Sequence, residues 1–295
     1  MVQVIEKVCV LGAGTMGKQI ALCAAMAGYS TGCVDPDPVA VEKAVSFAET
    51  YFADQVKRGK MSQESALAGQ NNIRFTTKLE EAAADADLVI ESVPEVLELK
   101  RNIFSRLDKI CLEKTILVTN SSFIPSSRIA DATGRPGKVC NMHFFTPPIV
   151  MKPVEVVKGP HTSVETAQTV AGVCRSMGKF PIMLEKEIHG LLVNRVLDAI
   201  LRESLFLLDM GVASFEDIDT AVSLALGHRI PPFRVMDLIG LDVVNLIFME
   251  HYRETGDPRF KPSPSVVELV TQNRLGRKNG RGFYDYGKMM EERGY

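Results

Sequence analysis

Short apolar runs recur through the first two thirds of the chain, separated by segments whose apolar residues repeat at helical spacing. Runs of this length are typical of buried strands. From Val41 to Val56 the apolar residues share one helical face, which predicts a long helix. Strands that alternate with helices predict a mainly parallel, helix-covered sheet of the α/β class. The strand-like runs lie at residues 8–11, 31–34, 73–75, 88–91, 115–119, 139–142 and 154–157.

The pattern changes near residue 188. Long apolar runs with helical periodicity follow, such as Gly190 to Met210 and Val235 to Met249, and strand signals become rare. We therefore predict two domains, an α/β domain over residues 1–187 and an all-helical domain over residues 188–295. The helical part is rich enough in apolar residues to bury one face against a partner chain, although a self-contained bundle is an open alternative.

A glycine motif joins the first strand to the helix that follows it. Gly12-Ala13-Gly14-Thr15-Met16-Gly17 comes directly after the first apolar run, and the second run ends at Asp35. In a βαβ unit the first glycine makes the turn, the second admits a pyrophosphate and the third allows close packing. The helix N-terminus then binds the phosphates through its free N–H groups. This context predicts a Rossmann-type dinucleotide site.

Asp35 indicates which dinucleotide is bound. Its carboxylate is placed to accept hydrogen bonds from the ribose hydroxyls of the adenosine. The same negative charge would repel a ribose phosphate, and no arginine immediately follows, so NAD is favoured over NADP. A turn-starting role before Pro36 is the alternative.

Composition and charge describe an ordinary globular protein. The 295 residues are 46% hydrophobic, and 34 basic against 36 acidic side chains give a net charge of −2. There is no run of like charges, so no nucleic-acid or membrane partner is predicted. We see neither an apolar leader nor a span long enough to cross a bilayer, and we expect a cytoplasmic protein.

The cysteines also fit a reducing compartment. They lie mostly within apolar segments and have no CxxC spacing, so we expect small buried hydrophobic residues. No metal site is predicted. The six cysteines are Cys9, Cys23, Cys33, Cys111, Cys140 and Cys174.

Polar residues with catalytic chemistry follow the later strands. Ser122 precedes His143 by 21 residues, Glu155 follows His143 by 12, and Asn194 lies on the first predicted helix of the second domain. Histidine is suited to take a hydroxyl proton near neutral pH, and a carboxylate on its other nitrogen would fix the tautomer. Taken alone, His143 is more often a packed core histidine, and Ser122 and Asn194 are more often cap or turn residues.

Motifs spread over the whole length make the chain similar to the short-chain L-3-hydroxyacyl-CoA dehydrogenase family, particularly bacterial 3-hydroxybutyryl-CoA dehydrogenases. The resemblance implies a Rossmann-type N-terminal domain, a helical C-terminal domain that forms a homodimer, and a catalytic cleft between the domains. It also implies NAD as cofactor and a role in fatty acid metabolism. The motifs are LGAGTMG, ADLVIESVPE, TNSS, MHFFTPPIVMKPVEVVKG, GLLVNR, EDIDTA, DLIGLDVV and LGRKNGRGFYDY.

The resemblance assigns roles to individual residues. His143 matches the catalytic histidine and Glu155 its carboxylate partner, while Ser122 and Asn194 match residues that hydrogen-bond the reacting oxygen. A further set matches the cofactor site, and three basic residues match the cations that bind coenzyme A, although a solvated helix end is nearly as good an interpretation of those three. The cofactor set is Gly12, Ala13, Gly14, Thr15, Met16, Gly17, Asp35, Glu95, Lys100, Ser122, Thr146 and Lys278; the basic set is Lys57, Arg58 and Lys60.

Several departures from the family pattern bear on the substrate. Phe123 stands where the family has a second serine, and Thr146 replaces an asparagine near the cofactor. His189-Gly190-Leu191 and Arg229-Ile230-Pro231-Pro232 replace the family's PGF and PMGP segments. Such changes would reshape an acyl pocket.

The expected activity is the reversible NAD-dependent oxidation of a (3S)-3-hydroxyacyl-CoA to the 3-oxoacyl-CoA. His143 would take the proton while hydride passes to the cofactor. The first alternative keeps this chemistry on a free hydroxy acid, as in gulonate or carnitine dehydrogenases, or on a carrier-protein thioester. The second is an NAD-binding protein without catalysis.

Overall fold

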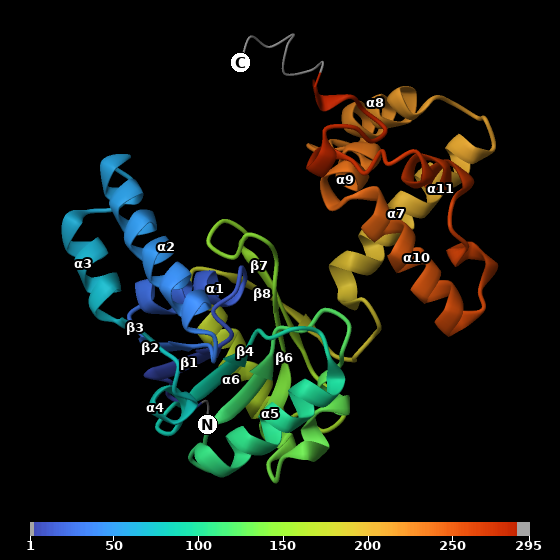
Figure 1. The fold of residues 1–295 in the computed structure, drawn as a ribbon. Helices are drawn as coiled ribbons and strands as arrows, with labels where there is room; N and C mark the ends of the chain where they lie inside the picture. The colour runs from blue at the N-terminus through green and yellow to red at the C-terminus, as the bar shows by residue number, and fades with distance from the viewer. Residues whose placement is uncertain (1–2, 288–295) are drawn as a thin grey trace. The chain divides into compact units, whose positions relative to one another are not determined.

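In the computed structural model, which describes residues 3–287, the first part of the chain forms one twisted sheet (Figure 1). Its strand order is β3-β2-β1-β4-β5-β6-β7-β8, and of these neighbours only β6 and β7 pair antiparallel. The strands are β1 (Lys7–Leu11), β2 (Ser30–Val34), β3 (Ile73–Thr76), β4 (Leu88–Glu91), β5 (Ile116–Thr119), β6 (Val139–Phe144), β7 (Pro153–Val157) and β8 (Phe180–Leu184).

Helices connect the strands and then continue alone to the end of the described chain. In the first part they are α1 (Gly17–Met26), α2 (Pro38–Lys57), α3 (Gln63–Asn71), α4 (Leu79–Ala83), α5 (Leu97–Ile110) and α6 (Val164–Ser176), with short 3-10 turns η1 (Ser126–Arg128), η2 (Ala130–Ala132) and η3 (Pro136–Lys138). The later ones are α7 (Leu191–Asp209), α8 (Phe215–Leu226), α9 (Pro232–Ile239), α10 (Leu241–Thr255) and α11 (Pro264–Thr271), with η4 (Pro258–Phe260) and η5 (Arg277–Asn279).

Alternating side chains of the strands build a core on each face of the sheet. Along β1, Val8 and Val10 join the cluster that contains residues of α1 and α6. Cys9 and Leu11 point the other way and join the cluster that contains residues of α4 and α5. Both faces are covered, as a mainly parallel sheet requires, and this buries the strand ends that carry the site residues.

The chain divides into two compact units, the first ending at Leu192 and the second beginning at Val193. The second unit, which we call the helical unit, packs α7–α11 around an apolar core. Four aromatic rings, those of Phe215, Phe233, Phe283 and Tyr284, contact one another at edge-to-face or tilted angles within this core. Burial of such rings is a large contribution to the stability of a helical domain.

The predicted fold class is confirmed. Every apolar run singled out as a strand forms one, from β1 to β7, and the predicted helix from Val41 to Val56 lies within α2. Strand β8 was not predicted, because it contains Pro181 and its pattern is half exposed, which is typical of an edge strand. All six cysteines are free and buried as expected, and burial raises the pKa of the Cys111 thiol to about 11.

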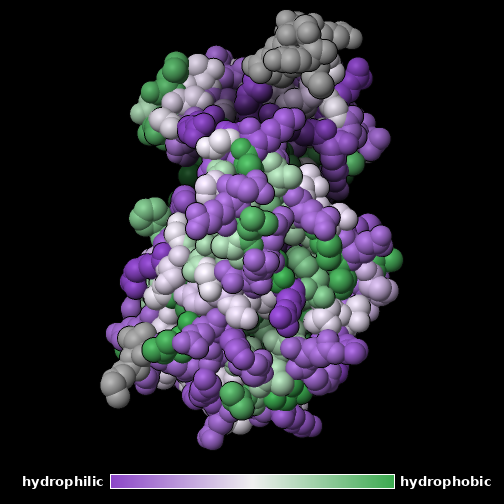
Figure 2. Space-filling model, turned by 90° about the vertical axis from the view of Figure 1, so that its left-hand side faces the viewer, coloured by the Kyte–Doolittle hydropathy of each residue, from purple (hydrophilic) through white to green (hydrophobic). Residues whose placement is uncertain are grey.

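The face of the molecule in Figure 2 carries many hydrophilic side chains, with hydrophobic ones in small groups among them. Among the described residues, none of the helices combines the length and the apolar character that a membrane span requires.

Candidate active site

The glycine loop is closely packed on its inner side and open at its middle. Gly12 has φ +100°, and a Cβ there would lie 2.4 Å from the carbonyl oxygen of Ser92. A Cβ on Gly17 would lie 1.7 Å from the carbonyl oxygen of Gly12, so neither position admits a side chain. A Cβ on Gly14 would have no neighbouring heavy atom within 4 Å. The loop can therefore admit a phosphate at Gly14, at the N-terminus of α1.

Asp35 lies beside this loop, directly after β2. Its carboxylate accepts a hydrogen bond of 2.8 Å from the N–H of Ala13 and one of 3.0 Å from the N–H of Asp37. A carboxylate has about four lone-pair positions, so two remain for ribose hydroxyls. The side chain is thus fixed beside the glycine loop, and its role in binding the ribose stays a prediction.

An open cavity of about 410 Å³ adjoins the glycine loop. Its lining comes from residues 14–16, residues 92–95, Lys100 and residues 120–123, so it includes the predicted site residues Glu95, Lys100 and Ser122. The open backbone at Gly14, the free end of α1 and this cavity are the features that a dinucleotide needs. The residues present therefore fit NAD.

His143 and Glu155 face each other across the antiparallel pair of strands β6 and β7. The distance from His143 Nδ1 to Glu155 Oε2 is 2.8 Å, and the two residues are 5% and 0% exposed. An ionised carboxylate can only accept a hydrogen bond, so this contact places the ring proton on Nδ1. The ring of Phe145 packs against that of His143 at 4.9 Å and restricts its rotation.

Ser122 approaches the other side of the imidazole from the loop after β5. Its Oγ lies 3.0 Å from His143 Nε2. With the proton on Nδ1, Nε2 is an acceptor, and the serine hydroxyl donates to it. The structure thus brings Ser122, His143 and Glu155 together in a chain of two hydrogen bonds.

Glu95 and Lys100 hold the loop that carries Ser122. Glu95 accepts hydrogen bonds from the Ser121 hydroxyl and from the N–H groups of Phe123, at 3.0 Å, and Ile124, at 3.1 Å. Burial raises the pKa of Glu95, but the Ser121 hydrogen bond and the charge of Lys100 outweigh it, and the pKa lies below its ordinary value. Lys100 Nζ is 3.3 Å from Glu95 Oε2 and 2.7 Å from Glu91 Oε1.

Three further predicted site residues, Thr146, Asn194 and Lys278, lie outside the hydrogen-bonded chain of Ser122, His143 and Glu155. The Thr146 hydroxyl contacts the sulfur of Met16 in the glycine loop at 3.1 Å, so it lies at the nucleotide end of the site. Asn194 is half-buried in the first turn of α7. Lys278 forms an ion pair with Asp242 within the helical unit.

The predicted coenzyme A cations lie at the end of α2. Lys57 is the last residue of this helix, Arg58 forms an exposed ion pair of 2.8 Å with Asp54, and Lys60 is exposed. A helix of 20 residues is about 30 Å long, so these cations lie roughly that far along the helix from Asp37, its N-cap. Figure 1 shows α2 and α3 projecting from the sheet together.

Three buried polar residues around the site, Glu91, Thr119 and Asn141, were not predicted from the sequence. Glu91 accepts from the Thr119 hydroxyl at 2.6 Å and pairs with Lys100, and Asn141 contacts the Ser122 loop. The available signal was a polar side chain inside an otherwise apolar strand. Such a pattern indicates that the buried polar side chain needs a hydrogen-bond or ion-pair partner, but it does not identify the partner residue.

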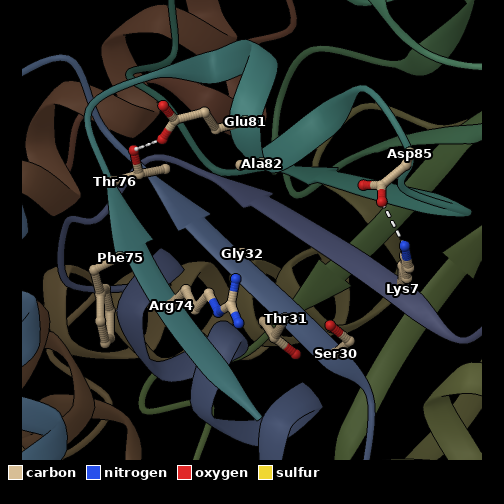
Figure 3. A pocket seen from close by; sticks show the side chains of 10 residues that line it. All are labelled: Lys7, Ser30, Thr31, Gly32, Arg74, Phe75, Thr76, Glu81, Ala82 and Asp85. Atoms are coloured by element: carbon tan, nitrogen blue, oxygen red, sulfur yellow. Dashed lines mark hydrogen bonds and ion pairs between the residues drawn. The ribbon is translucent and has the colours of Figure 1, made fainter. Parts of the chain in front are cut away.

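A second cavity, of about 550 Å³, lies over β2, β3 and α4 (Figure 3). Gly32 lies on its floor, where a Cβ would be 3.1 Å from the Cβ of Ala82. Its rim carries the Lys7–Asp85 ion pair and the hydrogen bond between Thr76 and Glu81. It includes none of the predicted site residues. Over residues 3–287 there is also no cluster of three or more histidine, cysteine or carboxylate side chains that could hold a metal ion.

Comparison with known proteins gives two family matches that together span the fold. Residues 7–188 match the 3-hydroxyacyl-CoA dehydrogenase NAD binding domain, and residues 190–286 match the 3-hydroxyacyl-CoA dehydrogenase C-terminal domain. The chain belongs to the 3-hydroxyacyl-CoA dehydrogenase family. The resemblance seen in the sequence is confirmed, and so are NAD as the cofactor and an NAD-dependent oxidoreductase as the class of enzyme.

Individual relatives extend the match over almost the whole chain. A 3-hydroxybutyryl-CoA dehydrogenase of Clostridioides difficile is 38% identical over 96% of this chain and 100% of its own. The crystal structure of the (S)-3-hydroxybutyryl-CoA dehydrogenase PaaH1 from Ralstonia eutropha superimposes with a TM-score of 0.89 at 35% identity, covering 96% of this chain and 99% of its own. A 5-formyl-3-hydroxy-2-methylpyridine 4-carboxylate 5-dehydrogenase of Mesorhizobium japonicum is 31% identical over 96% of this chain and 91% of its own.

Proposed function

We propose that this protein catalyses the reversible oxidation of a (3S)-3-hydroxyacyl-CoA to a 3-oxoacyl-CoA, with His143 as the acid and base. The observation that carries the proposal is the hydrogen-bonded chain from Ser122 through His143 to Glu155. Oxidation of a secondary alcohol requires a base for the hydroxyl proton, and Nε2 of His143 lies against Ser122, which lines the cavity. The family membership supports the same reaction class.

The residues of this chain manage the proton. In the oxidation direction, Nε2 of His143 takes the proton of the substrate hydroxyl, and the ring becomes an imidazolium. Glu155, fully buried and 2.8 Å from Nδ1, stabilises that positive charge and keeps the ring oriented. The Ser122 hydroxyl, freed from Nε2, donates to the substrate oxygen as its negative charge develops. In the reduction direction the same groups act in reverse.

Bound NAD supplies the hydride acceptor for this reaction. The chain contributes the glycine loop for the phosphates, Asp35 for the ribose and the cavity beside Ser122 for the nicotinamide end. By resemblance, we keep Asn194 as a second ligand of the substrate oxygen and Lys278 as a further cofactor ligand. Alanine at Asn194 is expected to lower kcat, and an unchanged kcat would remove it from this role.

The test is reduction of acetoacetyl-CoA by NADH, followed by the loss of absorbance of the reduced nicotinamide. Free acetoacetate and NADPH serve as matched controls, because they change only the thioester and only the ribose phosphate. We expect turnover with acetoacetyl-CoA and NADH, and at least tenfold less with either control. Turnover of acetoacetate at the same rate would contradict the thioester assignment.

A second candidate keeps the reaction and changes the substrate to a ring alcohol or a free hydroxy acid. Two observations favour it. The Mesorhizobium relative is named for a pyridine carboxylate, and Phe123, which lines the cavity, packs against His189 with ring centroids 5.7 Å apart. An aromatic wall of this kind offers a stacking surface to a flat substrate. If Phe123→Ser raises turnover of acetoacetyl-CoA while turnover of an aromatic hydroxy acid falls, the wall selects against acyl chains.

We further propose that the helical unit forms a homodimer and that the basic end of α2 binds coenzyme A phosphates. Exposed apolar side chains on and after α7 and α8 support the first point, since large exposed apolar groups mark association surfaces. They include Phe206, Met210, Val212, Leu224 and Leu226, which are 56–83% exposed. The test is the solution mass by light scattering, which Leu224→Glu should halve if the surface is the interface.

For the proposed binding of coenzyme A phosphates at the end of α2, Lys57→Ala and Lys60→Ala should raise KM for the thioester without changing kcat.

A further inference from the structure

One buried amide connects the strand of the histidine to the loop of the serine. Asn141 lies on β6, two residues before His143, and its side chain is on the same face of the strand. The residue is 0% exposed. A buried amide must be hydrogen-bonded within the protein, because an unsatisfied polar atom in the interior has lost its water partners and gained none.

Asn141 makes three contacts with one short loop. Its Oδ1 accepts a hydrogen bond of 2.8 Å from the N–H of Ser126. Its Nδ2 donates to the carbonyl oxygen of Ser121 at 3.2 Å and to that of Ile124 at 3.3 Å. One N–H facing Oδ1 and two carbonyls facing Nδ2 define the orientation of the amide.

This loop, residues 121–126, depends on side chains for its backbone hydrogen bonds. It follows β5 and ends at Ser126, the first residue of η1, and no strand in the described part of the chain pairs with it. Glu95 binds the N–H groups of Phe123 and Ile124 from the side of the cavity. Asn141 binds carbonyl groups of the same loop from the side of the sheet. Glu95 and Asn141 thus each bond residues on both sides of Ser122 in the chain.

We infer that Asn141 is a positioning residue, which holds the loop so that the Ser122 hydroxyl stays against His143. The inference rests on the proposed function, because it assigns to Asn141 an effect on the serine that binds the reacting oxygen. The geometry is direct: Asn141 and His143 share one rigid strand, and the loop is fixed to that strand through Asn141. The distance of 3.0 Å between Ser122 Oγ and His143 Nε2 is thereby set from the strand that carries the base.

Small errors in this distance have large effects on rate. A misplacement of about 1 Å in a reacting group costs roughly a hundredfold. Without the amide, the carbonyls of Ser121 and Ile124 lose a buried partner, and the loop has to shift to recover one. We therefore expect Asn141→Ala and Asn141→Ser to lower kcat by about ten- to a hundredfold while KM for NADH changes little. The serine variant provides a smaller polar side chain in case the alanine variant does not fold.

A double-mutant cycle separates positioning from a general loss of stability. If Asn141 acts through Ser122, then in a Ser122→Ala background the change at Asn141 removes almost no further activity. The matched control is Thr115→Val, because the fully buried Thr115 donates to the carbonyl of Ala86 at 2.7 Å just before β5, away from the loop. We expect it to lower the melting temperature and leave kcat unchanged.

Hydrogen exchange gives a readout that needs no substrate. In the Asn141 variants the amides of Phe123, Ile124 and Ser126 should exchange faster, while those of β1 and β4 keep their wild-type rates. Equal loss of activity in both backgrounds, or unchanged exchange in the loop, overturns the inference. If the wild-type protein turns over no 3-oxoacyl thioester, the proposed function fails, and the exchange rates alone then decide the role of Asn141.

Discussion

Buried acidic groups are used differently in the two units of this protein. In the sheet unit, Glu91 pairs with Lys100, and Glu155 pairs with His143. In the helical unit, Asp219 accepts from the N–H of Phe233 and the hydroxyl of Tyr284. Burial raises the pKa of Asp219, whereas the pKa of Glu95, an exposed acid of the sheet unit, lies below its ordinary value because of the Ser121 hydrogen bond and the charge of Lys100. Glu91 and Glu155 of the sheet unit thus pair with a lysine and a histidine, whereas Asp219 of the helical unit accepts from a backbone N–H group and a tyrosine hydroxyl.

Asp237 shows what the helical unit gains. It is fully buried and accepts hydrogen bonds from the N–H groups of Phe283 and Tyr284 and from the hydroxyl of Tyr286. A Cβ on Gly282 would lie 1.9 Å from its Oδ1, so the C-terminal segment passes directly over the carboxylate. This acid anchors a segment of the fold. We therefore expect substitutions of acids in the sheet unit to lower kcat, and substitutions of acids in the helical unit to lower the free energy of unfolding.

The largest effect is expected at the histidine. His143→Gln removes the group that takes the proton, and loss of a general base costs roughly 10²–10⁴ in rate. Binding of NADH, measured by fluorescence, should stay within about twofold of wild type. His228→Gln in the helical unit is the matched control, and it should leave kcat unchanged. Turnover by the His143 variant near the wild-type rate would show that another group is the base.

The next largest effect is expected at Glu155. In Glu155→Gln the amide can donate to Nδ1, which moves the ring proton to Nε2 and blocks proton uptake from the substrate. We expect kcat to fall by about 10²-fold or more, with the pH profile of the remaining activity displaced. A variant with wild-type kcat and an unchanged pH profile would show that the carboxylate does not set the protonation of His143.

Local sequence spacing was sufficient for the parts of the site that are built from one segment. The turn at Gly12, the helix that starts at Gly17 and the carboxylate of Asp35 all lie within one βαβ unit, so their residue types and order encode their geometry. The strands β1 to β7 were likewise predicted, because each is a short apolar run.

Other parts depend on contacts between distant segments, which spacing does not encode. Glu91 and Asn141 look like isolated polar residues in apolar strands, and their partners become evident only when β4, β5 and β6 lie side by side. The pairing of His143 with Glu155 was suggested by the resemblance. The antiparallel pairing of β6 and β7 explains it, because its register puts the two residues opposite each other.

A smaller effect, on stability rather than rate, is expected at Asp237. Asp237→Asn leaves one acceptor oxygen for three donors and turns an amide N–H toward them, which costs about 2–4 kcal/mol. The melting temperature should fall, and kcat of the folded fraction should stay at its wild-type value. Asp242→Asn, at an exposed ion pair with Lys278, is the control and should change the melting temperature little. A loss of kcat at full folding would mean that Asp237 also contributes to catalysis.

The smallest effect is a difference in the pH dependence of the two units. Asp219 and Asp237 have raised pKa values, so the folded state binds their protons more tightly than the unfolded state does. The helical unit therefore loses stability as the pH rises above about 4, the ordinary pKa of an aspartate. Glu95 has a lowered pKa, so the stability it contributes is present above about 4 and is lost as the pH falls through its folded value. Hydrogen exchange, corrected for intrinsic rates, tests this difference between about pH 4 and pH 7. As the pH rises, the protection of the amides around Asp219, such as that of Phe233, should fall. The protection of the Ser122 loop should be maintained. In Asp219→Asn the first trend should flatten, because the titrating group is gone. The same trend in both units would mean that Asp219, Asp237 and Glu95 do not set the pH dependence of their units.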